Sequence, residues 1–371
     1  MRVDERSPLR RGWTTGACAA AAAKAAYAAL RSGVFPDPVE ITLPGGQRPA
    51  FALAETRLSA GAATAGVIKD AGDDPDVTHG ALVRATISAA APGSGLIFRA
   101  GRGVGTVTRP GLPLPPGEPA INPVPRRIIA GALADIGPAH PDLVVEIGIE
   151  GGEALAERTL NGRLGIVGGL SVLGTTGIVV PYSCAAWIDT IRRGIDVARA
   201  CGLDHVAGAT GRASEVAIRA RHGLSEIALI DMGDFVGGML KYLRTHPVPR
   251  VTIAGGLAKM TKLAQGRLDL HAARGGADMV ALGEVAGRLG NGALAARIGG
   301  ANTVAEAFAH ADAAGVALGD AVARAAWQTA AEVLDTPRIA LEVVLFDRDG
   351  RPCGAHGFAP AHDPSRPRNR R

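Results

Sequence analysis

The sequence predicts an α/β protein in two parts: an α+β N-terminal domain, then a Rossmann-like domain with a parallel sheet and flanking helices. Over residues 1–155, one long helix is followed by short apolar runs that read as strands. From residue 163 on, apolar β-branched runs recur about every 20–25 residues and alternate with helix-like stretches, which is typical of consecutive βα units. The 371 residues, 47% of them hydrophobic, suffice for two domains.

The N-terminal domain opens with a helix. Thr14, Thr15 or Gly16 can cap it, it runs to about Arg31, and Gly33 ends it. Glycines and prolines separate the apolar runs that follow. We expect strands near residues 39–43, 51–54, 82–88, 96–100 and 143–149.

A long segment rich in proline and glycine lies between the last two of these strands, GRGVGTVTRPGLPLPPGEPAINPVPRR. A segment of this length without regular structure is usually functional or disordered. Because its many prolines restrict the backbone, we expect an ordered loop, followed by a helix near residues 126–133.

The second half contains three βα units. We expect their strands at 205–209, 227–231 and 251–254, and their helices at 213–221, 235–244 and 257–264. Residues 277–334 read as largely helical, and a final strand at 339–346 ends at a turn over 347–350. The expected domains are 1–155 and 156–337, with a terminal strand at 338–350 that can pair with either sheet and a disordered basic tail at 360–371.

Charge and cysteine content narrow the function classes. Four of the positive charges that make up the net charge of +5 are arginines of the tail, so the remainder of the chain is about neutral. Nucleic-acid binding therefore gains little support. The four cysteines form no CxxC pair, which argues against zinc, iron–sulfur and disulfide sites and indicates a reducing compartment. Cys18 is either a thiol activated at a helix start or a small packed side chain, and the Ala-rich helix favours packing.

No membrane segment is expected. Arg10 and Arg11 before the Ala-rich run imitate a secretion signal, but Lys24 interrupts the run and alanine is only weakly apolar. The sequence therefore indicates a soluble cytoplasmic protein with no membrane partner.

Small or acidic residues follow each strand of the three βα units. In open α/β sheets, ligands bind outside the carboxyl ends of the strands, where glycine permits close approach and helix N-termini attract anions. Asp231 either binds ribose hydroxyls or caps a helix, whereas Asp234 is expected to be a cap. The G-x-G-x-x-G fingerprint and the Walker loop are absent, so a nucleotide-like cofactor other than nicotinamide or ATP is favoured. The expected cofactor-binding residues are Gly208, Thr210, Gly211, Asp231, Gly233, Gly255 and Gly256.

Two of the five lysines follow these glycines. Lys259 and Lys262 are three residues apart and share a helix face, which is either a binding surface or a solvated face. His271 follows and can change its charge near neutral pH.

Five motifs, in order, resemble those of the cobalt-precorrin-5B C-1-methyltransferase family. The resemblance covers nearly the whole chain, and the long proline-rich motif is the most specific part of it. The motifs are LRRGWTTGACAAAAAKAAYAAL, GVGTVTRPGLPLPPGEPAINPVPRR, RLGIVGGLSVLGTTGIVVPYS, MGDFVGGML and GGLAKMTKLAQGRLDLH.

The resemblance implies methyl transfer from S-adenosylmethionine to C-1 of cobalt-precorrin-5B in cobalamin biosynthesis, with the cobalt-corrin as substrate and no protein-bound metal. The sulfonium methyl group is already electrophilic, so alignment is the main requirement. Since the corrin precursor carries many carboxylates, basic residues are the expected partners. His271 is the candidate catalytic residue. The expected substrate-binding residues are Thr14, Thr15, Arg109, Arg126, Arg127, Lys259 and Lys262.

Ordinary surface or loop-anchoring charge is the alternative for the arginines. For the whole protein, the alternatives are a non-catalytic tetrapyrrole carrier and a nicotinamide-dependent reductase of a corrin precursor. A homo-oligomer is compatible with the sequence.

Overall fold

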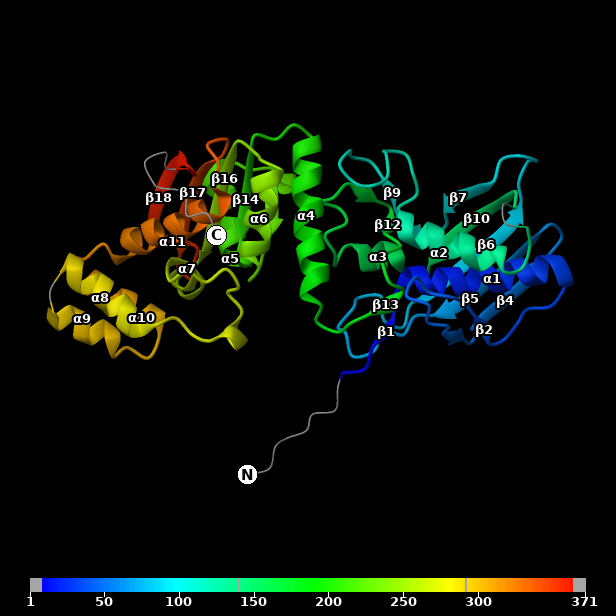
Figure 1. The fold of residues 1–371 in the computed structure, drawn as a ribbon, viewed down its shortest axis with the longest axis horizontal. Helices are drawn as coiled ribbons and strands as arrows, with labels where there is room; N and C mark the ends of the chain where they lie inside the picture. The colour runs from blue at the N-terminus through cyan, green and yellow to red at the C-terminus, as the bar shows by residue number, and fades with distance from the viewer. Residues whose placement is uncertain (1–8, 139–140, 291, 363–371) are drawn as a thin grey trace, which may run out of the picture. The chain divides into compact units, whose positions relative to one another are not determined.

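The computed structural model describes residues 9–138, 141–290 and 292–362, and the chain divides into two compact units, Met1–Ser183 and Cys184–Arg371 (Figure 1). From the sequence, this boundary was expected at residue 155. The structure differs because residues 166–179 form short strands that pair within unit 1. These pairs are β11 (Ile166–Val167) with β9 (Thr106–Val107), β12 (Gly169–Leu170) with β8 (Gly103–Val104), and β13 (Ile178–Val179) with β1 (Gly12–Trp13).

The main sheet of unit 1 has the order β4-β5-β6-β10-β7 and is antiparallel except for the β10–β7 pair. Its strands are β4 (Glu55–Ser59), β5 (Ala62–Ile68), β6 (Leu82–Ala89), β7 (Leu96–Ala100) and β10 (Leu143–Ile149); β2 (Val39–Glu40) and β3 (Ala50–Phe51) form a separate pair. The last three strands of the main sheet confirm the prediction. The β4–β5 hairpin was not expected, because β4 is polar and exposed and β5 is rich in alanine.

Helix α1 (Thr15–Ser32) confirms the predicted first helix. Thr14 Oγ1 accepts a hydrogen bond from Ala17 N at 3.2 Å, and Gly33, with φ +80°, donates to Ala29 O at 2.8 Å. Eight alanines between positions 17 and 26 are completely buried. Their small side chains let α1 pack closely on β5, β6 and α2 (Pro123–Ala134), so the two helices cover one face of the sheet (Figure 1).

The proline-rich segment is an ordered loop, as predicted, and α2 follows it. Val107, Leu114, Ala120 and Ile166 form a small core beneath the loop. The short helix α3 (Gly152–Ala156) packs on β12 and β8. The loop therefore has its own apolar support, which explains why so irregular a segment is fixed.

Unit 2 contains a five-stranded sheet of order β15-β14-β16-β17-β18, in which only the β17–β18 pair is antiparallel. The strands are β14 (His205–Ala209), β15 (Leu229–Asp231), β16 (Arg250–Gly256), β17 (Ala340–Phe346) and β18 (Pro352–Pro360). The predicted final strand thus belongs to unit 2. β18 was missed, and the tail expected from residue 360 instead begins with a buried Ala361, whereas residues 363–371 lie outside the described residues.

Helices cover both faces of this sheet. α5 (Arg212–His222) lies on one face over a small core, while α6 (Val236–Thr245), α7 (Leu257–Ala264) and α11 (Leu318–Leu334) pack on the other. The remaining helices are α4 (Cys184–Ala200), α8 (Met279–Leu289), α9 (Gly292–Gly299) and α10 (Val304–Ala313), with 3₁₀ turns at Glu226–Ala228 and Ala272–Arg274. Strands β14, β16 and β17 are buried on both sides, which is why they read as continuous apolar runs.

Candidate functional site

The carboxyl ends of β14, β15 and β16 lie side by side because these strands are parallel neighbours. From β14 the chain continues to β15 on one side of β14 and then crosses to β16 on the other side. The direction in which strands are added therefore reverses between β14 and β16. Ligands of open α/β sheets bind outside the carboxyl ends at such a point. We call this region the switch edge. It collects the seven expected cofactor-binding residues, Gly208, Thr210, Gly211, Asp231, Gly233, Gly255 and Gly256.

Four of the five glycines of the switch edge fall into two kinds. A Cβ added to Gly208 or Gly255 would lie 2.4 or 2.5 Å from a methionine sulfur, so these two glycines allow close internal packing. A Cβ added to Gly211 or Gly256 would meet nothing within 4 Å. Gly211 and Gly256 are therefore the positions at which a ligand can approach the backbone.

Three helices begin at the switch edge without side-chain caps. The N-cap residues of α5, α6 and α7 are Gly211, Phe235 and Gly256, and none of them makes a side-chain capping bond. By contrast, Asp278 and Thr303 cap α8 and α10. Uncapped backbone N–H groups at a helix N-terminus favour an anionic ligand.

Thr210 and Lys259 connect β14 to α7 at this edge. Thr210 N donates to Ala254 O at 3.0 Å, and Thr210 Oγ1 accepts from Gly256 N at 3.4 Å. The ammonium of Lys259 donates to Thr210 O at 2.7 Å and lies 3.0 Å from Asp234 Oδ1. Lys259 is therefore fixed at the switch edge, although about a third of its side chain stays exposed.

The expectation that Asp234 caps a helix is wrong, and so is the capping alternative for Asp231. The N-cap of α6 is Phe235, which lies beyond both. The Asp234 carboxylate instead pairs with Lys259, although its buried Oδ1 accepts no hydrogen bond with good geometry. Attraction to a nearby ammonium outweighs capping here, because the charged pair is partly shielded from water.

Lys262 and His271 do not lie with Lys259 at the switch edge. Lys262 is 7% exposed, and its ammonium donates to Leu270 O at 2.9 Å, so it holds the loop that follows α7. His271 is exposed, and its Nδ1 accepts from Ala273 N at 3.2 Å. Of the three, only Lys259 lies at the switch edge, and the solvated-face interpretation fits neither lysine.

Trp187, which was not predicted from the sequence, contacts the switch edge from α4. Its indole N–H donates to Asp231 O at 3.0 Å, and its side chain is 45% exposed. The available signal was scarcity, since the chain has only three tryptophans.

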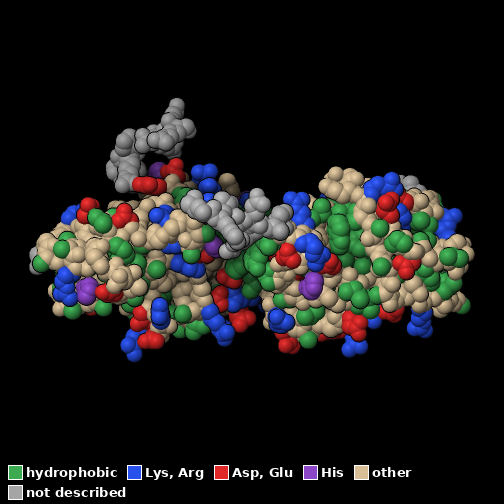
Figure 2. All heavy atoms as spheres, turned by 90° about the horizontal axis from the view of Figure 1, so that it is seen from below, with side chains coloured by type: hydrophobic (Ala, Val, Ile, Leu, Met, Phe, Trp, Pro, Cys, Tyr) green, Lys and Arg blue, Asp and Glu red, His purple; other side chains and the backbone are tan. Residues whose placement is uncertain are grey.

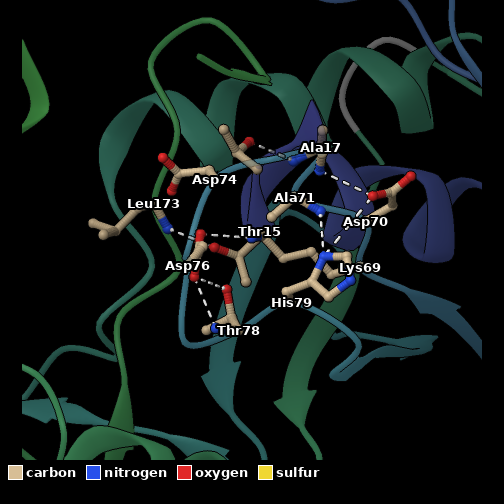
Figure 3. Close-up of polar contacts among 12 residues, drawn as sticks. Thr15, Ala17, Lys69, Asp70, Ala71, Asp74, Asp76, Thr78, His79 and Leu173 are labelled. Atoms are coloured by element: carbon tan, nitrogen blue, oxygen red, sulfur yellow. Dashed lines mark hydrogen bonds and ion pairs between the residues drawn. The ribbon is translucent and has the colours of Figure 1, made fainter. Parts of the chain in front are cut away.

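A second polar cluster surrounds the start of α1 in unit 1 (Figure 3). Lys69, which is 1% exposed, donates to Asp76 Oδ2 at 2.7 Å, and Asp76 Oδ1 accepts from Thr78 N at 2.8 Å and Thr78 Oγ1 at 2.6 Å. Burial would raise the pKa of Asp76, but Lys69 and Thr78 outweigh burial and lower it. No sequence motif flagged this pair.

Thr14 and Thr15 lie beside this cluster and hold the entry of α1. Thr14 caps the helix, and Thr15, which is 5% exposed, accepts from Leu173 N at 3.4 Å. Cys18, one turn further, is fully buried, and burial raises the pKa of its thiol to about 12. The packed interpretation of Cys18 is confirmed, because its side chain is completely buried in the core of unit 1.

The three loop arginines differ in what they contact. Arg109 donates to Arg163 O at 2.9 Å. Arg126 donates to Ile121 O and to Glu118, both at 2.8 Å, and its guanidinium lies 5.0 Å from the ring centre of Phe98. Both therefore anchor the loop. Arg127 is exposed on α2, and among the described residues nothing is bonded to its guanidinium.

The surface drawn in Figure 2 mixes basic and acidic side chains instead of gathering basic ones into a patch. Within residues 9–138, 141–290 and 292–362, no helix is long and apolar enough to cross a membrane. In the same residues, no group of three His, Cys, Asp or Glu side chains is arranged to hold a metal ion.

Comparison with known proteins assigns the family. A family model described as CbiD matches residues 2–181, and one described as the CbiD C-terminal domain matches residues 269–357. The chain belongs to the CbiD family. Its sequence is 60% identical to the cobalt-precorrin-5B C(1)-methyltransferase of Agrobacterium fabrum, over 98% of this chain and 97% of the relative. It is 64% identical to the protein of the same name from Halorhodospira halophila, over 95% of each chain.

A solved relative is the cobalamin biosynthesis protein CbiD from Archaeoglobus fulgidus, determined at 1.9 Å. It is 28% identical, and the match covers 67% of this chain and 77% of that one with a TM-score of 0.38.

Proposed function

We propose that this CbiD family member transfers a methyl group from S-adenosylmethionine to C-1 of cobalt-precorrin-5B, giving cobalt-precorrin-6A. The observation that carries the proposal is full-length similarity to relatives bearing that activity in their names, at 53–64% identity. Because each match covers at least 93% of this chain, both units have counterparts in those enzymes.

We assign the cofactor to the switch edge and unit 2 to the Rossmann-like class. Its parallel strands have the order 2-1-3-4 when numbered along the chain, which is that of a doubly wound sheet. Asp231 ends the second strand, and in such folds an acidic residue about 20 positions after the glycine turn binds ribose hydroxyls. Open space over Gly211 and Gly256, with uncapped helix starts, suits the carboxylate of the methionine moiety.

The bound cofactor would supply its methyl group as an electrophilic sulfonium. The residues of the chain then have to hold and align the two reactants, which accounts for most of what such a transfer requires. Lys259, fixed by Thr210 and Asp234, offers a positioned positive charge at the edge. The exposed guanidinium of Arg127 is suited to a corrin carboxylate.

Calorimetric titration with S-adenosylhomocysteine tests the cofactor assignment. Asp231→Ala should weaken binding by on the order of 1–3 kcal/mol, because a buried hydrogen bond to the ligand is lost. Asp204→Ala is the matched control, since Asp204 is an exposed acid at the opposite, amino end of the sheet, paired with Arg250 at 2.9 Å.

Equal affinities for Asp231→Ala and the parent protein would remove Asp231 from the cofactor site. A wild-type chain that binds the corrin substrate but neither S-adenosylmethionine nor S-adenosylhomocysteine would be a carrier, and the proposed function would fall.

A further inference from the structure

Trp187 is a large aromatic side chain that is both exposed and held in place. It belongs to the first turn of α4, and 45% of it faces solvent. Its indole N–H donates to Asp231 O at 3.0 Å, and its ring lies 6.2 Å from that of Phe235, centre to centre. The hydrogen bond at its polar end and the contact with Phe235 therefore hold a ring whose surface is partly open to solvent.

The backbone beneath the ring is shaped to admit it. Gly233 has φ +52°, and a Cβ added there would come within 3.2 Å of Trp187. Gly233 N in turn donates to Ala209 O at 3.2 Å, at the end of β14. The indole therefore packs on a glycine backbone one strand away from the switch point.

The place of the ring indicates what it would contact. The proposed function assigns the ribose to Asp231, and the adenine of S-adenosylmethionine is attached directly to that ribose. Because Trp187 is hydrogen-bonded to the main chain of Asp231, its exposed surface lies within reach of a base joined to a sugar at that residue. Aromatic side chains are suited to purines, since stacking requires only a flat π-face.

We infer that Trp187 is the stacking platform for the adenine ring of the methyl donor. This inference rests on the proposed function. The indole would have a positioning role, because it would orient the adenosyl group so that the sulfonium extends toward Gly211 and Gly256, away from the indole ring. Gly233 would be required to keep the platform flat against the sheet edge.

Fluorescence of the full chain gives a readout that does not depend on activity. In a variant carrying Trp13→Phe and Trp327→Phe, Trp187 is the only tryptophan. Saturation with S-adenosylhomocysteine should quench its emission and reduce its accessibility to acrylamide, because the base covers the exposed ring.

Calorimetry then separates stacking from other roles. Trp187→Ala should weaken the binding of S-adenosylmethionine, S-adenosylhomocysteine and adenosine alike, by about tenfold, which is typical of one lost base–aromatic stack. Trp187→Phe keeps a ring and should stay within about threefold of the parent. Trp327→Phe is the matched control, since Trp327 also donates its indole N–H to a main-chain oxygen, that of Leu341 at 2.8 Å, but at the amino end of β17.

The outcomes distinguish the two proposals. Unchanged affinity for S-adenosylhomocysteine in a folded Trp187→Ala, with normal binding by the parent, would overturn the platform and leave the proposed function standing. A loss confined to S-adenosylmethionine would show that the indole faces the sulfonium cation, which also overturns the adenine assignment. A parent chain that binds none of these ligands would refute the proposed function itself, and the platform with it.

Discussion

Replacing Asp76 by Asn should destabilise unit 1 strongly, because it leaves the ammonium of Lys69 buried without its counter-charge. Lys69 is 1% exposed and lies 2.7 Å from Asp76, whereas the Asp76 side chain is 26% exposed. Breaking one partner of a buried pair costs about 3–5 kcal/mol. Because Asp76 is partly reached by water, we expect the lower end, about 3 kcal/mol.

The reverse substitution should be milder. In Lys69→Met the buried charge is replaced by an apolar side chain of similar length, and Asp76 keeps its hydrogen bonds from Thr78 and its contact with water. We expect Lys69→Met to cost about 1 kcal/mol, and Asp76→Asn to cost little more once Lys69→Met is present.

Urea unfolding measures these differences when the signal comes from unit 1 alone. Trp13 is suited to this, because its ring lies 5.5 Å from that of Phe51 within the unit 1 core. With Trp187 and Trp327 replaced by Phe, the fluorescence midpoint follows Trp13.

The pH dependence provides a second measurement. The folded-state pKa of Asp76 is lowered, so its stabilising contribution is present above the unfolded-state pKa of about 3.9 and is lost as the pH falls through the lower folded-state value. Asp76→Asn should lack that loss. A cost for Asp76→Asn below about 1 kcal/mol, or one that is undiminished beside Lys69→Met, would refute the reasoning.

Three further predictions follow from buried or anchored groups. Burial, followed by the charges of His222 and Arg250, lowers the pKa of His205 to about 4. The free energy of unfolding of unit 2 should therefore fall by roughly 2–3 kcal/mol as the pH falls from about 6.5 to 4, because the unfolded chain binds the proton more readily. His205→Gln should flatten this pH dependence of the urea midpoint, and an unchanged slope would contradict the prediction. Lys262→Met should lower the thermal midpoint of unit 2, because the hydrogen bond from Lys262 to Leu270 O is lost, which costs about 1–2 kcal/mol of stability. Lys259→Met should instead change ligand affinity more than stability. If Lys262→Met changed mainly affinity and Lys259→Met mainly stability, the roles assigned to the two lysines would be reversed. The third concerns the loop and α2, where Arg127→Gln should raise the Michaelis constant for the corrin substrate several-fold with little effect on turnover, and steady-state kinetics that show a fall in turnover alone would exclude carboxylate binding.

The sequence by itself determined the elements that local patterns encode. The bounds of β14 and α7 agree with prediction residue for residue, and Thr14 and Gly33 mark the ends of α1 as capping chemistry requires. Caps, turns and hydrophobic periodicity depend only on neighbours along the chain, which is why they can be read in one dimension. The order of the βα units also placed small and acidic residues at strand ends, and parallel pairing brings those ends together.

Only the tertiary structure decided where the charged and aromatic side chains point. Lys259 and Lys262 are three residues apart on one helix, yet the first reaches Thr210 and the second is buried against Leu270. Trp187 contacts a strand end 44 residues away.

The unit boundary and the β4–β5 hairpin were likewise not predictable, because the strands that decide them are short, polar or rich in alanine. Lys69 shows the common reason. Its burial depends on Asp76 and on the core beneath α1. Contacts between segments that are far apart in the chain produce no hydrophobic periodicity in either segment, so they cannot be predicted from the sequence of one segment.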